Sequence, residues 1–306
     1  MLAVMALCSL CSFQSNTIFA VANMASSHTI HLHIHAFVLR SSYGEGDDYM
    51  PKLPCSLPPK KQCQYPNPML EIGMAMLVIR KHAEDWLVDM ERIAVCGFSA
   101  GAHNAAMYGV YWNDAMMSNA LYTSNQALRP AALILGYALT DYVLMESFNK
   151  TEFAQSFYNA TEEAYLGCAA PDRNLLIRVS PTYLVNGDVL PTFLWATSED
   201  NMVPVLNRIN MAHSLAENGI PFELHIFERG AHGLSLANQT TALSKAEINY
   251  DAAKWTDLAD AWLIKRFAFE LPDTSGLEEV STSVLGGMNS YVSVSSQRFT
   301  FYYSAS

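Results

Sequence analysis

Basic residues are scarce in this 306-residue chain, and no lysine or arginine precedes Arg40. The chain has 18 lysines and arginines against 29 aspartates and glutamates, and its net charge of −11 repels nucleic acid phosphates and anionic lipid headgroups. Without a basic start, the apolar N-terminus matches a secretory signal peptide only weakly. No run reaches the roughly 18 consecutive apolar residues of a membrane span. We therefore expect no nucleic acid or membrane partner and a cytoplasmic location, with secretion as the alternative.

Paired cysteines are also lacking, since the six cysteines are scattered without the spacing of a disulfide framework. Cys8 and Cys11 form one C-x-x-C, but no second pair and no nearby histidine completes a zinc site. His31, His33 and His35 would share one face of a strand, which keeps a metalloprotein open as an alternative. No other pattern requires a metal or an organic cofactor, and we expect none.

About half of the residues are apolar, and short apolar runs alternate with longer amphipathic stretches. This alternation predicts an α/β fold with a doubly wound, mostly parallel sheet and helices on both faces. Strands are expected at 35–40, 92–98, 131–138, 191–197 and 222–228. Helices are expected at 67–86, 203–219 and 250–269.

The composition divides the chain into one main domain and two flanking segments. We place the α/β domain at 35–270, after an atypical N-terminal segment at 1–34 and before a C-terminal tail at 271–306 rich in serine and threonine. The stretch at 140–190 is too long for a simple connection between strands, so it predicts a partly helical insertion.

The sequence "GFSAG", residues 97–101, follows the expected strand at 92–98 and precedes a helix-like stretch. In this context G-x-S-x-G forms a sharp turn that lifts the serine above the edge of the sheet, and the small residues let the backbone make that turn. A serine hydroxyl is a poor nucleophile by itself and needs a base and a third group that orients the base. Ser99 is therefore the candidate nucleophile.

The acid and the base should follow Ser99 in that order, each beyond the end of a later strand. Asp200 follows the strand at 191–197, and the adjacent Glu199 stays as an alternative acid. His232 follows the strand at 222–228 in a loop flanked by glycines, which makes it the candidate base. His103, one helical turn beyond Ser99, is expected to point away from the site.

Four segments together resemble the acetylxylan-esterase-like, carbohydrate-esterase-like branch of the α/β-hydrolases over residues 35–268. They are "YPNPMLEIGMAMLVIRKHAEDW", "RIAVCGFSAGAH", "PTFLWATSEDNMVPV" and "PFELHIFERGAHGLSLAN". The resemblance implies an α/β-hydrolase fold, Ser99 as nucleophile, Asp200 as orienting acid and His232 as general base. It also implies hydrolysis of short acyl esters, often on sugars or xylan, without a cofactor.

One element of that family is missing from residues 1–34. The family carries a phrase of the H-G-G-G or P-G-G-G kind there, whose backbone N–H groups supply half of the oxyanion hole, and this segment contains no such phrase. The N-terminal strands of the fold are therefore expected to be missing or altered. The backbone N–H of Ala100, directly after the nucleophile, is the one oxyanion donor that the sequence predicts.

The sequence thus predicts a serine hydrolase that cleaves a small-molecule or carbohydrate ester. A serine peptidase of the prolyl-oligopeptidase type is one alternative, although the chain has no room for the large propeller domain that such enzymes usually carry. A catalytically impaired, hydrolase-like binding protein is another, because of the missing glycine-rich phrase. The oligomeric state stays open.

Overall fold

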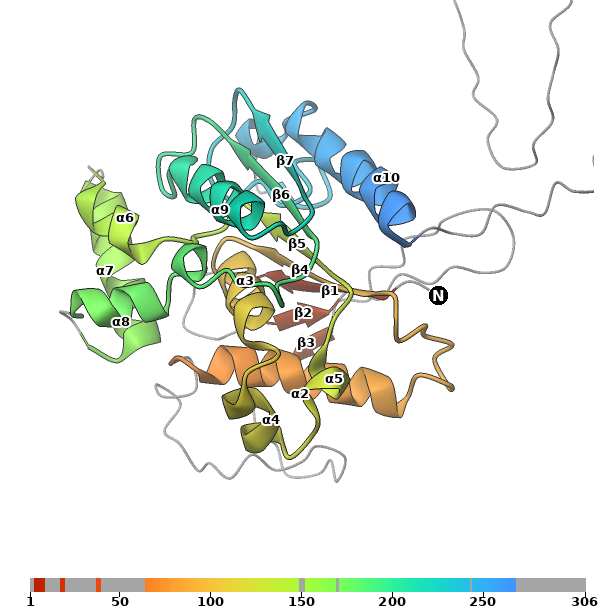
Figure 1. Ribbon diagram of the computed structural model, residues 1–306. Helices are drawn as coiled ribbons and strands as arrows, with labels where there is room; N and C mark the ends of the chain where they lie inside the picture. The colour runs from red at the N-terminus through yellow and green to blue at the C-terminus, as the bar shows by residue number, and fades with distance from the viewer. Residues whose placement is uncertain are drawn as a thin grey trace, which may run out of the picture.

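The main sheet of the protein has five parallel strands, as the computed structural model in Figure 1 shows. The structure describes residues 64–148, 152–168, 171–242 and 244–267, together with the backbone of three short N-terminal strands. In spatial order the main sheet comprises β1 (Ala3–Cys8), β4 (Ile93–Phe98), β5 (Ala132–Gly136), β6 (Thr192–Thr197) and β7 (Phe222–Phe227). A separate two-stranded antiparallel sheet contains β2 (Thr17–Phe19) and β3 (Phe37–Leu39).

Helices cover both faces of the main sheet, because the central strands are apolar on both sides. In β4, Ile93 and Val95 point into the core cluster that includes residues of α2 (Asn67–Lys81), α3 (Ala100–Tyr111) and α9 (Leu206–Glu217). Ala94, Cys96 and Phe98 point into the cluster built with α10 (Trp255–Phe267). This alternation is the two-residue period of a strand, and burial on both faces is typical of a parallel sheet. The expected doubly wound α/β architecture is confirmed.

The helices have the following bounds. On the way to the end of β5 the chain forms α2 (Asn67–Lys81), α3 (Ala100–Tyr111), α4 (Ala115–Leu121) and α5 (Asn125–Leu128). Between β5 and β6 it forms α6 (Tyr142–Ser147), α7 (Glu152–Leu166), α8 (Arg173–Arg178) and the 3₁₀ turn η1 (Pro181–Tyr183). The remaining helices are α9 (Leu206–Glu217), η2 (Lys245–Glu247), η3 (Ala252–Lys254) and α10 (Trp255–Phe267).

Figure 1 shows α6, α7 and α8 gathered at one side of the sheet, in the stretch expected to be a helical insertion at 140–190. Tyr142 of α6 and Tyr165 of α7 are buried, and both rings pack edge-on against His103 of α3. The three helices are therefore joined to the main fold through the helix that begins at Ser99.

The N-terminal strands differ from the expected arrangement. The strand expected at 35–40 forms as β3, but it pairs with β2 rather than with the parallel sheet. The reason is that β1 already pairs with β4 along its whole length, and β5 occupies the other side of β4. A strand of the segment 1–34, in which we expected strands to be missing or altered, thus forms one edge of the main sheet.

Candidate active site

The turn between β4 and α3 holds Ser99 in a backbone conformation that residues other than glycine rarely adopt. Its φ is +53° and its ψ is −119°, and its N–H donates a 3.0 Å hydrogen bond to the carbonyl of Gly136 at the end of β5. A Cβ on Gly97 would lie only 2.4 Å from the carbonyl oxygen of Gly101. The chain can therefore turn from the strand into the helix this sharply only because residue 97 has no side chain.

The N-terminus of α3 lies directly beside this serine. Ala100 is the first residue of the helix, and the first backbone N–H groups of a helix have no acceptor within it. They also lie at the positive end of the helix dipole. The expected oxyanion donor, the N–H of Ala100, is thus at a place suited to developing negative charge. The segment 9–16 after β1 lies outside the described residues, and so does most of the region searched for a glycine-rich phrase.

Asp200 is fully buried just beyond β6, and backbone groups fix its carboxylate. One oxygen, Oδ1, accepts hydrogen bonds from the N–H groups of Met202 (3.0 Å) and Val203 (2.9 Å). These bonds are made before α9 begins, and they leave the second oxygen, Oδ2, directed at His232. A buried carboxylate held by backbone donors keeps one orientation.

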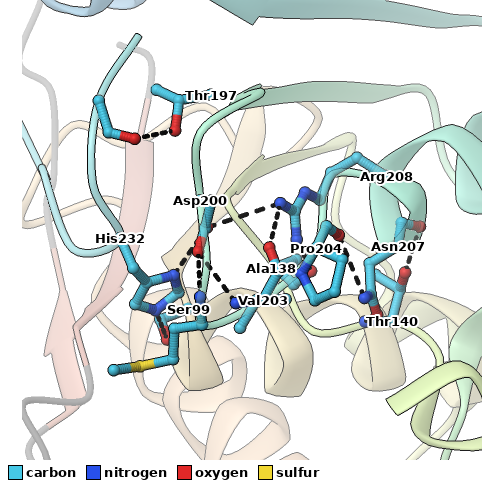
Figure 2. Close-up of polar contacts among 12 residues, drawn as sticks. Ser99, Ala138, Thr140, Thr197, Asp200, Val203, Pro204, Asn207, Arg208 and His232 are labelled. Atoms are coloured by element: carbon cyan, nitrogen blue, oxygen red, sulfur yellow. Dashed lines mark hydrogen bonds and ion pairs between the residues drawn. The ribbon is translucent and has the colours of Figure 1, made fainter. Parts of the chain in front are cut away.

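His232 lies between Asp200 and Ser99, as Figure 2 shows. Its Nδ1 is 2.8 Å from Asp200 Oδ2, and its Nε2 is 2.7 Å from Ser99 Oγ. Because an ionised carboxylate can only accept, Nδ1 carries the ring proton and Nε2 can accept from the serine hydroxyl. The ring of Tyr137 packs edge-on against the imidazole, with centroids 5.0 Å apart. The three sequence-predicted residues thus meet, although each follows a different strand.

The loop that carries His232 is held by contacts to the loop after β6. Thr197 Oγ1 donates a 2.7 Å hydrogen bond to the carbonyl of Gly230, and the N–H of Gly230 donates to Glu199 Oε2 at 3.1 Å. Asn249 Nδ2 donates to the carbonyl of Arg229. Glu199, the alternative acid, is exposed and contacts this backbone, whereas the contact to the His232 ring is made by Asp200.

Arg208 of α9 is a functional candidate that sequence reasoning missed. Its side chain is fully buried, and its guanidinium donates to the carbonyls of Ala138 (2.9 Å) and Val203 (2.8 Å). One nitrogen lies 3.6 Å from Asp200 Oδ2, the oxygen that accepts from His232. Figure 2 shows the guanidinium on the side of Asp200 away from the imidazole. A cation thus accompanies the three residues.

A signal for Arg208 was present in the helix expected at 203–219. The apolar positions of its inner face include Met211 and Leu215, and Arg208 lies three residues before the first of them. Residues three and four apart lie on the same face of a helix. A charged residue at a core-facing position is rarely buried without a partner. The position therefore indicates a buried ion pair, but it does not identify the acidic partner.

Asn207 fixes α9 against the loop after β5. Its Oδ1 accepts from the N–H groups of Thr140 (3.0 Å) and Asp141 (2.9 Å), and its own carbonyl accepts from Thr140 Oγ1 (2.6 Å). All three residues are buried. This contact holds the start of α9, and with it Arg208, at a fixed distance from Ala138.

The remaining described histidines lie away from Ser99. His103 is buried and its Nδ1 is 2.9 Å from the carbonyl of Leu139, as expected for a ring that points away from the site. Burial lowers the pKa of the His103 imidazole to about 4, and the hydrogen bond to Leu139 opposes that shift. The others contact acidic residues: His82 with Asp85, His213 with Glu217 and His225 with Glu223.

Two further expectations concern metal ions and membranes. Within the described part of the chain, no group of three or more histidine, cysteine, aspartate or glutamate side chains is placed to hold a metal ion. The side chains of Cys8, Cys11 and the histidines at 31, 33 and 35 lie outside the residues so described. Within the same part of the chain, no helix is both long and apolar enough to cross a membrane.

The fold and its sequence match known esterases. A family model described as BD-FAE matches residues 59–215, about half of the chain. The crystal structure of an acetyl ester-xyloside bifunctional hydrolase from Caldicellulosiruptor lactoaceticus is 32% identical with a TM-score of 0.54, covering 67% of this chain and 68% of that one. The carboxylesterase Cest-2923 from Lactobacillus plantarum WCFS1 is 28% identical with a TM-score of 0.54, covering 66% of this chain and 69% of that one.

A curated relative is much longer than this chain. Endo-1,4-beta-xylanase B of Butyrivibrio fibrisolvens is 30% identical over 205 residues, which is 67% of this chain and 28% of that protein. The chain spans no more than about a third of the length of the curated relatives that it matches. The family model and the solved structures nevertheless agree on one fold and one class of protein. The chain therefore belongs to the BD-FAE family of esterase-type α/β-hydrolases.

Proposed function

We propose that this chain is a serine carboxylic-ester hydrolase that cleaves short acyl esters, with acetylated sugars of the xylan type as the preferred class. The observation that carries the proposal is the continuous contact from Ser99 Oγ to His232 Nε2 (2.7 Å) and from His232 Nδ1 to Asp200 Oδ2 (2.8 Å). A nucleophile, a base and an orienting acid within hydrogen-bond reach of one another are the parts that acyl transfer needs.

In the first step Ser99 Oγ attacks the ester carbonyl while His232 Nε2 takes the hydroxyl proton. Asp200 holds the imidazole with its proton on Nδ1 and stabilises the imidazolium that forms. The tetrahedral oxyanion is placed near the N-terminus of α3, where the N–H of Ala100 can donate to it. His232 then protonates the leaving alcohol, and an acyl group remains on Ser99.

The second step reverses the proton transfers with water. His232 removes a proton from a water molecule, the resulting hydroxide attacks the acyl carbonyl, and the carboxylic acid leaves as Ser99 regains its proton. The side chain of His232 is 11% exposed, so water can reach the ring without opening the fold. The proposed chemistry uses only side chains and backbone of this chain.

The substrate class is proposed from two relatives. One solved structure of the same fold is an acetyl ester-xyloside bifunctional hydrolase, and one curated relative is named a xylanase. The negative charge of this chain disfavours anionic substrates, whereas acetylated sugars are neutral. The relatives thus favour a short acyl group on a carbohydrate, and a neutral acetylated sugar is compatible with the negative charge of this chain.

The first test is labelling of the purified protein with a fluorophosphonate probe, followed by turnover of aryl acetate, aryl butyrate, acetylated xylo-oligosaccharides and a peptide substrate. We expect labelling and acetate turnover in the wild type, and a loss of at least about 10⁴-fold in turnover for Ser99→Ala. Ser118→Ala, a serine on the distant helix α4, is the matched control and should keep full activity.

The outcomes separate the three candidate functions. Labelling and ester cleavage that depend on Ser99 support the proposal, whereas cleavage of the peptide alone would replace it with a serine peptidase. A folded protein that is neither labelled nor active would replace it with an impaired, hydrolase-like binding protein. Unchanged turnover in Ser99→Ala would remove Ser99 as the nucleophile.

A further inference from the structure

Arg208 shares one carboxylate oxygen of Asp200 with His232. Asp200 Oδ2 lies 2.8 Å from the imidazole Nδ1 and 3.6 Å from a guanidinium nitrogen of Arg208. Neither the Arg208 side chain nor the Asp200 side chain is exposed to solvent. Two opposite charges that water cannot screen therefore act on the same ring.

The position of the guanidinium is determined by its neighbours. Two of its nitrogens donate to the carbonyls of Ala138 and Val203, which belong to the loops after β5 and β6. Its Nε has no hydrogen-bond partner among the described residues. Burial lowers the pKa of Arg208 to about 10, while Asp200 acts to raise it. At neutral pH the group is therefore a fixed cation.

We propose that Arg208 is a positioning residue of this site whose positive charge neutralises Asp200. The His232 ring then stays unprotonated, and able to act as a base, down to a lower pH than it would beside Asp200 alone. This inference rests on the proposed function of Ser99, Asp200 and His232. The imidazolium adds a positive charge beside a pair whose net charge is zero. Without Arg208 the same imidazolium would lie beside an unbalanced anion, which favours the protonated ring.

The other described polar and ionisable groups near the His232 imidazole and the Asp200 carboxylate are uncharged, directed elsewhere or exposed. Tyr137, from the loop after β5, contacts the imidazole with its ring edge, and Ser99 contacts Nε2. On the same loop, Asp141 lies near Asn210 and Tyr183 rather than His232. Among the described residues, the remaining charged side chains near the site, on the loops after β6 and β7, are exposed and screened by solvent; they are Glu199, Glu228 and Arg229.

The test compares Arg208→Gln with Arg208→Lys, because glutamine keeps an N–H donor without the charge and lysine keeps the charge without the fork. The acidic limb of kcat/KM for an aryl acetate is measured, together with the pH titration of the His232 imidazole by NMR, assigned from its absence in His232→Asn. In Arg208→Gln we expect both midpoints to move upward by roughly one pH unit. In Arg208→Lys both stay at the wild-type position, with lower activity on the plateau.

A purely structural role predicts a different result. If Arg208 only braces the loops, both variants lose plateau activity and neither midpoint moves, which would overturn the proposal. A downward shift in Arg208→Gln would overturn it as well. Near-UV circular dichroism establishes in each case that the tertiary packing around the site is retained.

A second pair of variants covers the case in which Arg208→Gln does not fold. Asp200→Asn leaves the guanidinium uncompensated, and the double variant Asp200→Asn/Arg208→Gln removes both charges. We expect the imidazole of the single variant to titrate at lower pH than the wild type, and the double variant to recover at least part of that shift. Equal midpoints in the two variants would contradict the proposal.

The titration also separates this inference from the proposed function. It requires only the contact between His232 and Asp200, and it is measured without substrate or probe. If the wild type neither reacts with the fluorophosphonate nor cleaves esters, the proposed function fails, while the shift in Arg208→Gln still decides the role of Arg208.

Discussion

The proposed nucleophile and the proposed acid–base pair are held in place by two different parts of the molecule in two different ways. Ser99 is positioned by the backbone of its own neighbours, within residues 97–101, where β4 turns into α3. Asp200 and His232 are 32 positions apart in sequence and are joined by side-chain hydrogen bonds between loops. A local backbone turn can be recognised from sequence, whereas an assembly of side chains depends on the whole sheet.

The two regions also differ in how they can fail. At the turn, an added methyl group would meet backbone atoms that cannot move without displacing α3. In the loops, the loss of one side chain removes a hydrogen bond but leaves the strands that carry the loops. Substitution of Gly97 at the turn should therefore act on folding, whereas substitutions of side chains in the loops should act on catalysis.

The largest of these effects is expected for Asp200, the proposed orienting acid. Asp200→Asn should lower kcat/KM for an aryl acetate by about 10⁴-fold, because an amide can no longer hold His232 with its proton on Nδ1. Glu199→Gln is the matched control, since among the described residues its carboxylate accepts from the N–H of Gly230 alone, and it should cost less than about tenfold. Comparable losses in the two variants would contradict the assignment of Asp200.

The next largest effect is expected for Gly97, at the turn between β4 and α3. Gly97→Ala should lower the free energy of unfolding by about 3 to 4 kcal/mol, because its Cβ would lie 2.4 Å from the carbonyl oxygen of Gly101. Gly109→Ala is the control within α3, since its Cβ would meet only the movable side-chain end of Leu133, and about 1 kcal/mol is expected. Urea unfolding measures both values. A Gly97→Ala protein as stable as the wild type would show that the turn is not limited by this contact.

A third effect concerns His103 of α3, which packs against Tyr142 of α6 and Tyr165 of α7. The pKa of the His103 imidazole is about 4 in the folded protein and near 6.5 in the unfolded chain. Well above pH 6.5 the ring is neutral in both states, so its protonation does not reduce the free energy of unfolding there. Between about pH 6.5 and 4 the unfolded state alone takes up a proton, and the free energy of unfolding should fall by roughly 3 kcal/mol.

The measurement for His103 is urea unfolding at several pH values across that window. His103→Phe keeps a ring between Tyr142 and Tyr165 but cannot take up a proton, so its stability should change less with pH than that of the wild type. His213→Asn, at an exposed position on α9, should leave the slope unchanged. An identical slope in wild type and His103→Phe would show that the pH dependence arises elsewhere.

The smallest effect is expected for Tyr137, whose ring packs against His232. Tyr137 accepts a 2.9 Å hydrogen bond from the N–H of Ser235 and packs its ring against His232. Tyr137→Phe keeps the ring and removes the acceptor, so about 1 kcal/mol of stability should be lost and kcat should change only a few-fold. Tyr137→Ala, which also removes the ring, should reduce kcat more than Tyr137→Phe. Equal kcat values would show that the ring contact does not position His232.

Much of the fold could be predicted, because the apolar runs of β4, β5, β6 and β7 are bounded by residues that favour turns. Helix ends were less predictable. The helix expected at 203–219 begins only at Leu206, because Val203 precedes Pro204 and a residue before proline is disfavoured in the helical conformation. The prediction that the strand at 35–40 joins the parallel sheet was wrong, since a three-residue apolar strand carries no information about which edge of a sheet is free.

The residue pattern alone predicts the turn at Ser99, the order of serine, acid and histidine, and the alternation of strands and helices, because these follow from contacts between neighbours in the chain. The folded chain adds that Asp200 rather than Glu199 contacts His232, and that Arg208 contacts the same carboxylate. These depend on where loops from separate strands meet at one edge of the sheet. A residue pattern specifies the direction of each strand end, whereas the distance between two side chains is set by the packing of everything between them.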